Sequence, residues 1–169
     1  MQALSTLSLK GRALRALAGR EHSRTELERK LARFETVPGD LVQVLDELAA
    51  KGFINEQRVA EALAYRRGAK LGAARVVQEL KAKGVDPEAV ALAGAALKAT
   101  EYARAVEVWR KKFGRAGSGA ANSPLDTAPT PDTANSPSAA ERSKQMRFLA
   151  SRGFSAEVIR KTVSGAGEH

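Results

Sequence analysis

The residues most able to do chemistry lie together near the start of this 169-residue chain, in the stretch REHSRTELERKL at 20–31. The stretch places His22 beside Ser23, with Glu26 three residues further on. A serine, a histidine and a carboxylate can form a nucleophilic triad, provided that the serine and histidine side chains hydrogen-bond to each other. The same residues can begin a helix, because Ser-x-x-Glu is the spacing of a capping box. Two interpretations therefore compete, an active site and a helix start.

The helix start accounts for more of these residues. In a capping box the Ser23 hydroxyl accepts a hydrogen bond from the Glu26 amide, and the Glu26 carboxylate accepts one from the Ser23 amide. His22 and Leu27 then occupy the two positions of a hydrophobic staple. The other histidine, His169, is the last residue, and no other pattern sets a base against Ser23. We therefore expect a helix start rather than an active site.

Other patterns that carry chemistry are missing from the sequence. There is no cysteine, which excludes disulfides and thiolate chemistry and suits a reducing compartment. The two histidines are too far apart for a paired metal motif, and neither GxxxxGK[ST] nor GxGxxG occurs. The stretch GAKLGAAR at 68–75 lacks the Lys-Ser/Thr ending, so we interpret it as a loop between helices. The sequence predicts no catalytic residue, no metal and no cofactor.

The charge of the chain is strongly positive. Lysine and arginine number 28 against 19 aspartates and glutamates, a net charge of +9. The basic residues recur in blocks at 10–33, 66–83, 104–115 and 142–161. This excess predicts attraction to nucleic acid or to an acidic protein surface, with a merely solvated surface as the alternative. The start does not resemble a signal peptide and no apolar run is long enough for a membrane span, so we expect a cytoplasmic protein.

The composition favours an all-α fold. Hydrophobic residues make up 43% of the chain and aromatic residues only 5%, with alanine, leucine, arginine, lysine and glutamate prominent. These are the residues that lose least on entering a helix. Asp40, Asn55, Asp86 and Ser155 can each cap a following helix. The periodicity predicts helices over about 8–19, 24–34, 41–51, 56–68, 72–83, 87–98, 101–113, 141–152 and 156–163.

These nine expected helices form three sets of three. The pattern Leu-x-x-Lys/Arg-Gly-apolar occurs at Leu80 and again at Leu149, each time followed by a cap residue. It also occurs at Leu48, which defines a rival register with a spacing of 32 residues, but we prefer the longer period. Residues 114–140 contain four of the six prolines and no aromatic residue, which predicts a flexible insertion. We therefore expect three three-helix modules. They cover 1–54, 55–99 and 100–169, and the insertion at about 114–140 interrupts the third.

Exposed basic residues are the candidates for partner or nucleic-acid contact. They flank the predicted helix–loop–helix around 66–83 and recur near helix ends elsewhere. Trp109, with helical spacing to its apolar neighbours, is expected to pack in a core rather than stack on a base. The twelve candidates are Arg20, Arg24, Arg66, Arg67, Lys70, Arg75, Lys81, Lys83, Arg110, Lys111, Lys112 and Arg152.

Four stretches together resemble the RecX family, regulators of the bacterial recombinase RecA. They are REHSRTELERKL (20–31), GFINEQRVAEAL (52–63), YRRGAKLGAARVVQELKAKGV (65–85) and FLASRGFSAEVIRKTV (148–163). Each is short, but the four occur in the family's order, and the resemblance as a whole extends over nearly all of the chain apart from 114–140. Two departures are the long turn RFETVPGDL in the first module and the insertion in the third.

The resemblance implies an elongated, curved array of three tandem three-helix modules without enzymatic activity. It implies binding to RecA and to its filament on single-stranded DNA, with inhibition of ATP hydrolysis, strand exchange and recombination. We expect a monomer that reaches single-stranded DNA directly or through the filament. The positions carried over are Arg20, His22, Ser23, Arg24, Arg66, Arg67, Gly72, Arg75, Glu79, Leu80, Lys83, Gly84, Arg152, Gly153 and Phe154. Of these, the arginines and Lys83 are expected to contact the partner.

Two other functions stay open at this point. One is a stand-alone helical DNA-binding protein of the helix-turn-helix kind, which needs base-reading residues at the start of a recognition helix. The helix starts at Glu56-Gln57, Pro87-Glu88 and Ala156-Glu157 are acidic or apolar, which argues against reading of base sequence. The other is a helical scaffold for an acidic protein partner.

Overall fold

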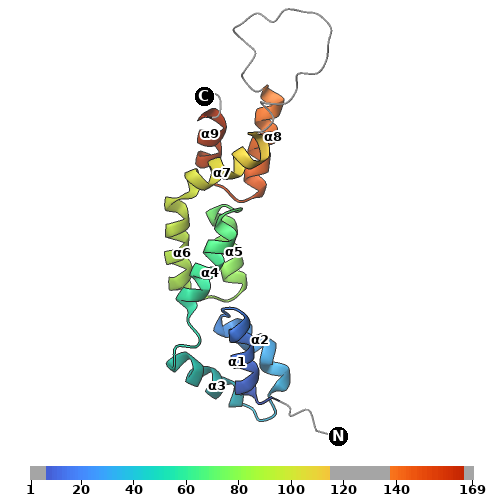
Figure 1. Cartoon of the computed structure of the whole chain (residues 1–169), viewed down its shortest axis with the longest axis vertical. Helices are drawn as coiled ribbons and strands as arrows, with labels where there is room; N and C mark the ends of the chain where they lie inside the picture. Colours follow the sequence, from blue (N-terminus) through green and yellow to red (C-terminus); the bar gives the residue numbers. More distant parts are fainter. Residues whose placement is uncertain (1–6, 115–137, 166–169) are drawn as a thin grey trace, which may run out of the picture. The chain divides into compact units, whose positions relative to one another are not determined.

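The computed structural model describes residues 7–114 and 138–165, and its ordered elements over these ranges are helices (Figure 1). The predicted all-α class is confirmed, since the described part of the chain contains no strand. None of the helices it describes is long and apolar enough to cross a membrane. The elements are α1 (Leu9–Gly19), α2 (Arg24–Leu31), η1 (Ala32–Phe34), α3 (Asp40–Ala50), α4 (Glu56–Gly68), α5 (Ala73–Ala82), α6 (Pro87–Ala99), α7 (Glu101–Phe113), α8 (Ala139–Ser151) and α9 (Ala156–Gly165).

The chain divides into two compact units. Unit 1 contains the described residues up to Arg66 together with Val77–Gly94, and unit 2 contains Arg67–Val76 together with the described residues from Ala95 onward. Helices α4, α5 and α6 therefore contribute residues to both units. The module boundaries expected after residues 54 and 99 remain a prediction.

In unit 1, α1, α2 and α3 pack against one another around one apolar core (Figure 1). The sequence periodicity placed these residues on the inner faces, and they are buried: Ala13, Leu27, Leu31, Leu41, Leu45 and Leu48. The start of α3 differs from expectation. Asp40 was expected to cap this helix, but Gly39 is the N-cap, with φ 96°, and Asp40 lies in the first turn. A carboxylate there still opposes the positive end of the helix dipole.

In unit 2, α7, α8 and α9 pack around a second apolar core that includes Ala105, Leu149 and Ile159. Trp109 lies against this core, and its indole Nε1 donates to Oε1 of the buried Gln145 at 3.1 Å. The predicted packing role of Trp109 is therefore confirmed. The insertion expected at about 114–140 falls almost entirely outside the described residues.

Local chemistry sets several helix ends as predicted. Asn55 Oδ1 accepts from the Arg58 amide at 2.9 Å, and Asp86 Oδ1 accepts from the Glu88 amide at 2.9 Å, so both residues cap the following helices. Gly84 and Gly153, which end α5 and α8, have φ of 67° and 81°. This left-handed conformation is open to glycine because it lacks a Cβ.

Candidate partner-binding surface

The cluster at 20–26 is a helix start. Ser23 Oγ accepts from the Glu26 amide at 3.1 Å, and Glu26 Oε2 accepts from the Ser23 amide at 3.2 Å, which completes the capping box. The Ser23 hydroxyl donates its proton to the Lys83 carbonyl at 2.6 Å and is fully buried. Nδ1 of His22 lies 2.9 Å from the Arg20 carbonyl instead of facing the serine. The predicted helix start is confirmed, because the serine proton is already committed to a backbone carbonyl.

Glu26 is the electrostatic centre of this cluster. Its carboxylate accepts hydrogen bonds from Arg20 Nη2 at 3.0 Å and from Lys83 Nζ at 2.9 Å, in addition to the one from the Ser23 amide. Burial by itself would raise the pKa of Glu26, but these hydrogen bonds outweigh it and lower the pKa to about 2. Burial lowers the pKa of His22, which favours the neutral imidazole. Two of the predicted contact residues, Arg20 and Lys83, therefore also hold the fold together.

The turn after α5 docks on the start of α2 within unit 1. In addition to the Ser23 bond to Lys83, Thr25 Oγ1 donates to the Gly84 carbonyl at 3.1 Å. A Cβ on Gly84 would collide with the Thr25 side chain. The Lys-Gly pair that marks the sequence repeat is therefore a docking turn in the structure.

Unit 2 contains the same kind of docking. The Gly72 amide, just before α5, donates to the Arg152 carbonyl at 2.9 Å. Arg152 Nη1 donates to the Lys70 carbonyl at 3.2 Å, and its guanidinium lies 4.8 Å from the centre of the Phe148 ring. The Arg-Gly turn after α8 thus docks on the start of α5. Arg152, predicted to contact a partner, has a clear structural role as well.

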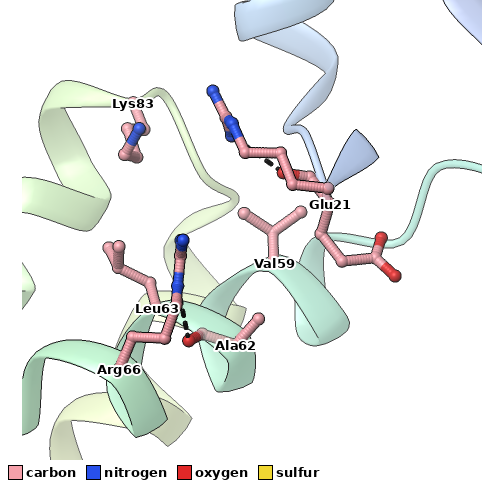
Figure 2. A pocket seen from close by; sticks show the side chains of 7 residues that line it. Glu21, Val59, Ala62, Leu63, Arg66 and Lys83 are labelled. Atoms are coloured by element: carbon pink, nitrogen blue, oxygen red, sulfur yellow. Dashed lines mark hydrogen bonds between the residues drawn. The ribbon is translucent and has the colours of Figure 1, made fainter. Parts of the chain in front are cut away.

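Three of the twelve predicted residues line one pocket of about 250 Å³ in unit 1, which we call the basic pocket. Figure 2 shows Arg66 rising from α4 beside Leu63 and Val59, with Lys83 across the pocket. Arg20 is the third cation, and Ala62 and Glu21 complete the lining. The pocket thus combines an apolar floor with a cationic rim.

The carboxylate of Glu21 does not neutralise the basic pocket. Figure 2 shows it pointing away from Arg66 and Lys83, and its Oε1 accepts from Arg58 Nε at 3.0 Å. Arg66 is exposed, and within the described part of the chain its Nε donates to the Ala62 carbonyl of its own helix alone, at 3.4 Å. Arg66 is therefore the lining residue best placed to meet an anionic group of a partner.

The other predicted residues are spread over both units. Arg24 is paired with Asp46 at 2.6 Å and Glu28 at 3.0 Å, so its charge is largely balanced within the fold. Lys81 is exposed on α5 in unit 1. Unit 2 holds the remaining candidates, which are exposed apart from the half-buried Arg152: Arg67, Lys70, Arg75, Arg110, Lys111 and Lys112. Their roles in binding remain predictions.

Sequence reasoning did not single out a second basic surface in unit 1. Arg12 and Arg15 of α1 line it together with Lys30 of α2 and Arg33 of η1. The signal was present, because Arg12 and Arg15 are three residues apart, as are Lys30 and Arg33, and such pairs share a helix face.

Among the residues that the structure describes, no group of three His, Cys, Asp or Glu side chains could hold a metal ion.

The fold and the basic surfaces of unit 1 define a class of protein, one built of three-helix units that carry basic surfaces. Known proteins belong to the same class. Residues 55–93 match the family model for the second three-helix domain of RecX, and residues 131–163 match the model for its third three-helix domain. Together with relatives that match over most of its length, these matches show that the chain belongs to the RecX family of regulatory proteins.

Relatives over the full length agree with these matches. The chain is 43% identical to a regulatory protein RecX of Leptothrix cholodnii, over 93% of this chain and 88% of the relative. It is 42% identical to the regulatory protein RecX of Herminiimonas arsenicoxydans, over 96% and 95% of the two chains. The crystal structure of RecX from Lactobacillus salivarius matches with a TM-score of 0.72 at 18% identity, covering 95% of this chain and 96% of that one.

Proposed function

We propose that this RecX-family protein is a non-enzymatic regulator that binds RecA and its filament on single-stranded DNA. Binding lowers ATP hydrolysis, strand exchange and recombination by the filament. The protein acts in the cytoplasm, as a monomer and without a cofactor. Membership of a family of regulatory proteins supports the regulatory part of this proposal. The basic pocket around Arg66 is the observation that carries the binding part.

The basic pocket suits an anionic group carried on an apolar stem. A guanidinium presents a rigid fork of donors that matches a carboxylate or a phosphate, and a lysine adds a point charge. Val59, Ala62 and Leu63 offer apolar contact beneath these cations. An acidic side chain of RecA fits this combination, since its methylene groups can cover the apolar floor while its carboxylate reaches Arg66. Contact of this kind would hold the protein on the filament.

The test is ATP hydrolysis by RecA filaments assembled on single-stranded DNA. Adding the protein at sub-stoichiometric to equimolar ratios is expected to lower the hydrolysis rate, and sedimentation should show the protein bound to the filament. Unchanged hydrolysis across a range of salt concentrations would overturn the proposal. Tight, sequence-dependent binding to bare duplex DNA would instead favour a stand-alone DNA-binding protein.

A further inference from the structure

Two of the three cations that line the basic pocket are paired with a carboxylate that is not part of its lining. Arg20 donates to Glu26 through both terminal nitrogens, Nη1 to Oε2 at 3.3 Å and Nη2 to Oε1 at 3.0 Å. Lys83 Nζ donates to the same Oε1 at 2.9 Å. Arg66, the third cation, forms no ion pair within the described part of the chain. The fold therefore neutralises part of the charge of the pocket with a carboxylate of its own.

The Glu26 carboxylate occupies hydrogen-bond donors that an anionic group in the basic pocket would use. The Glu26 side chain is 14% exposed, against 42% for Arg20 and 26% for Lys83, so a partner can reach the two cations more easily than the carboxylate. An arriving carboxylate must share these donors with Glu26. It is also repelled by the negative charge of Glu26, since like charges a few ångströms apart near a protein surface interact appreciably. Both effects lower the affinity of the pocket for an anionic group.

We propose that Glu26 is an autoinhibitory residue, which competes with the anionic group of the partner for Arg20 and Lys83 and so limits the affinity of the basic pocket. The inference rests on the proposed function, in which this pocket receives an acidic side chain of RecA, and it adds the residue that sets the strength of that contact. The same ion pairs hold the turn after α5 on the start of α2. Stability and affinity therefore oppose each other at Glu26, as they often do at functional sites.

The opposite role for Glu26 would be to orient the two cations for the partner, in which case its removal would weaken binding. Other contacts argue against that role, because they keep both cations at the pocket without Glu26. Arg20 Nη1 also donates to the Glu21 carbonyl at 2.8 Å. The backbone of Lys83 is held by the hydrogen bond that its carbonyl accepts from Ser23 Oγ at 2.6 Å. Removal of the Glu26 charge is therefore expected to free donors for the partner rather than to displace them.

The test is a double-mutant cycle on binding to RecA filaments assembled on single-stranded DNA, measured by cosedimentation at several protein concentrations. Glu26→Gln removes the charge, while its amide oxygen can still accept from the Ser23 amide. This variant should bind the filament about threefold to tenfold more tightly than the wild type, although it is less stable. In an Arg66→Glu background the gain should shrink to about twofold or less, because that substitution disables the pocket.

Glu88→Gln is the matched control, because it makes the same charge change at an exposed position of α6 in unit 1, outside the lining of the pocket. It should bind like the wild type. Glu26→Asp is a second variant, which withdraws the carboxylate from the cations by one methylene group and should give a smaller gain; it carries the test if circular dichroism shows Glu26→Gln to be unfolded.

The outcomes separate this inference from the proposed function. Wild-type protein that binds the filament, with Glu26 variants that bind equally or more weakly, overturns the inference and leaves the proposed function standing. A gain in Glu88→Gln equal to that in Glu26→Gln also overturns the inference, because net charge then explains it. Wild-type protein that does not bind the filament overturns both.

Discussion

The Gly72 amide donates to the Arg152 carbonyl at 2.9 Å, across 80 residues of sequence, and at this point the backbones before α5 and after α8 touch. A Cβ on Gly72 would overlap the carbonyl group of Gly153. The glycine is therefore required for close approach of two backbone segments. The start of α5, which follows Gly72, does not require glycine, because other residues could also form it.

Gly72→Ala should consequently destabilise unit 2. The added methyl group must push the turn after α8 away, which breaks the bond to the Arg152 carbonyl. Overpacking of this kind costs about 1–3 kcal/mol of unfolding free energy. Thermal unfolding followed by circular dichroism measures the effect. Gly19→Ala is the control, because a Cβ at Gly19 would meet nothing within 4 Å; an equal loss in both variants would contradict the close-approach explanation.

Arg104 ties together backbone segments of unit 2. Its Nη1 donates to the carbonyls of Gly68 and Leu71 at 2.6 and 2.7 Å, and its Nη2 donates to the Leu97 carbonyl at 2.6 Å. Burial lowers the pKa of Arg104. Arg104→Met should lower the unfolding free energy by about 2 kcal/mol or more, because it strands carbonyls that are partly shielded from water. Urea denaturation is the measurement, and Arg160→Met, at an exposed position of α9, should unfold like the wild type.

Glu26 makes the stability of unit 1 depend on pH. Its folded pKa of about 2 lies below the ordinary value of 4.5, so its ion pairs stabilise the fold fully above about pH 4.5. This contribution is lost as the pH falls from 4.5 to about 2, because over that interval the unfolded carboxylate is protonated while the folded one is still ionised. Glu26→Gln should be less stable than the wild type at neutral pH, and its stability should fall less steeply between pH 4.5 and 2. Denaturation at a series of pH values tests this, with the exposed Glu107→Gln expected to follow the wild-type curve.

Ser23 should matter more than an ordinary capping serine. Both Ser8 and Ser23 accept from an amide three residues later, but Ser23 is buried and also donates to the Lys83 carbonyl. Ser8→Ala removes only an exposed cap and should cost about 1 kcal/mol or less. Ser23→Ala also strands the Lys83 carbonyl, which is partly shielded from water, and should cost about 2 kcal/mol or more. Thermal unfolding measures the loss of stability in both variants. Equal losses would show that the hydrogen bond from Ser23 to the Lys83 carbonyl contributes nothing to stability.

Arg66 offers a direct test of the basic pocket in the proposed function. Charge reversal in Arg66→Glu should weaken binding to RecA filaments about tenfold, because the new carboxylate repels the anionic group that the pocket is proposed to receive. Helicity should be retained, since the side chain is exposed and donates to the Ala62 carbonyl of its own helix. Cosedimentation with filaments measures binding. Arg142→Glu makes the same charge change on α8 and is the control. An equal loss of filament binding in this variant would show that net charge alone explains the effect of Arg66→Glu.

The helices and most of their ends follow from local patterns in the sequence. Caps at Asn55 and Asp86, and the capping box of Ser23 with Glu26, involve residues within three positions of each other, so local spacing predicts them. Asp40 failed as a predicted cap because Gly39 before it can adopt positive φ and takes the N-cap position. The basic composition, the repeated Lys/Arg-Gly pattern and the family resemblance also came from sequence.

The contacts that those local features make depend on tertiary packing. Ser23 finds the Lys83 carbonyl 60 residues away, and Arg152 finds the Lys70 carbonyl 82 residues away. Such pairings depend on how helices pack, which spacing along the chain does not specify. The same holds for charge: packing pairs Arg24 with Asp46, while it leaves Arg12 and Arg33 stacked on Phe34. Residue type alone could not separate the cations that hold the fold from those that face outward, because that difference arises from the neighbours that folding brings to each one.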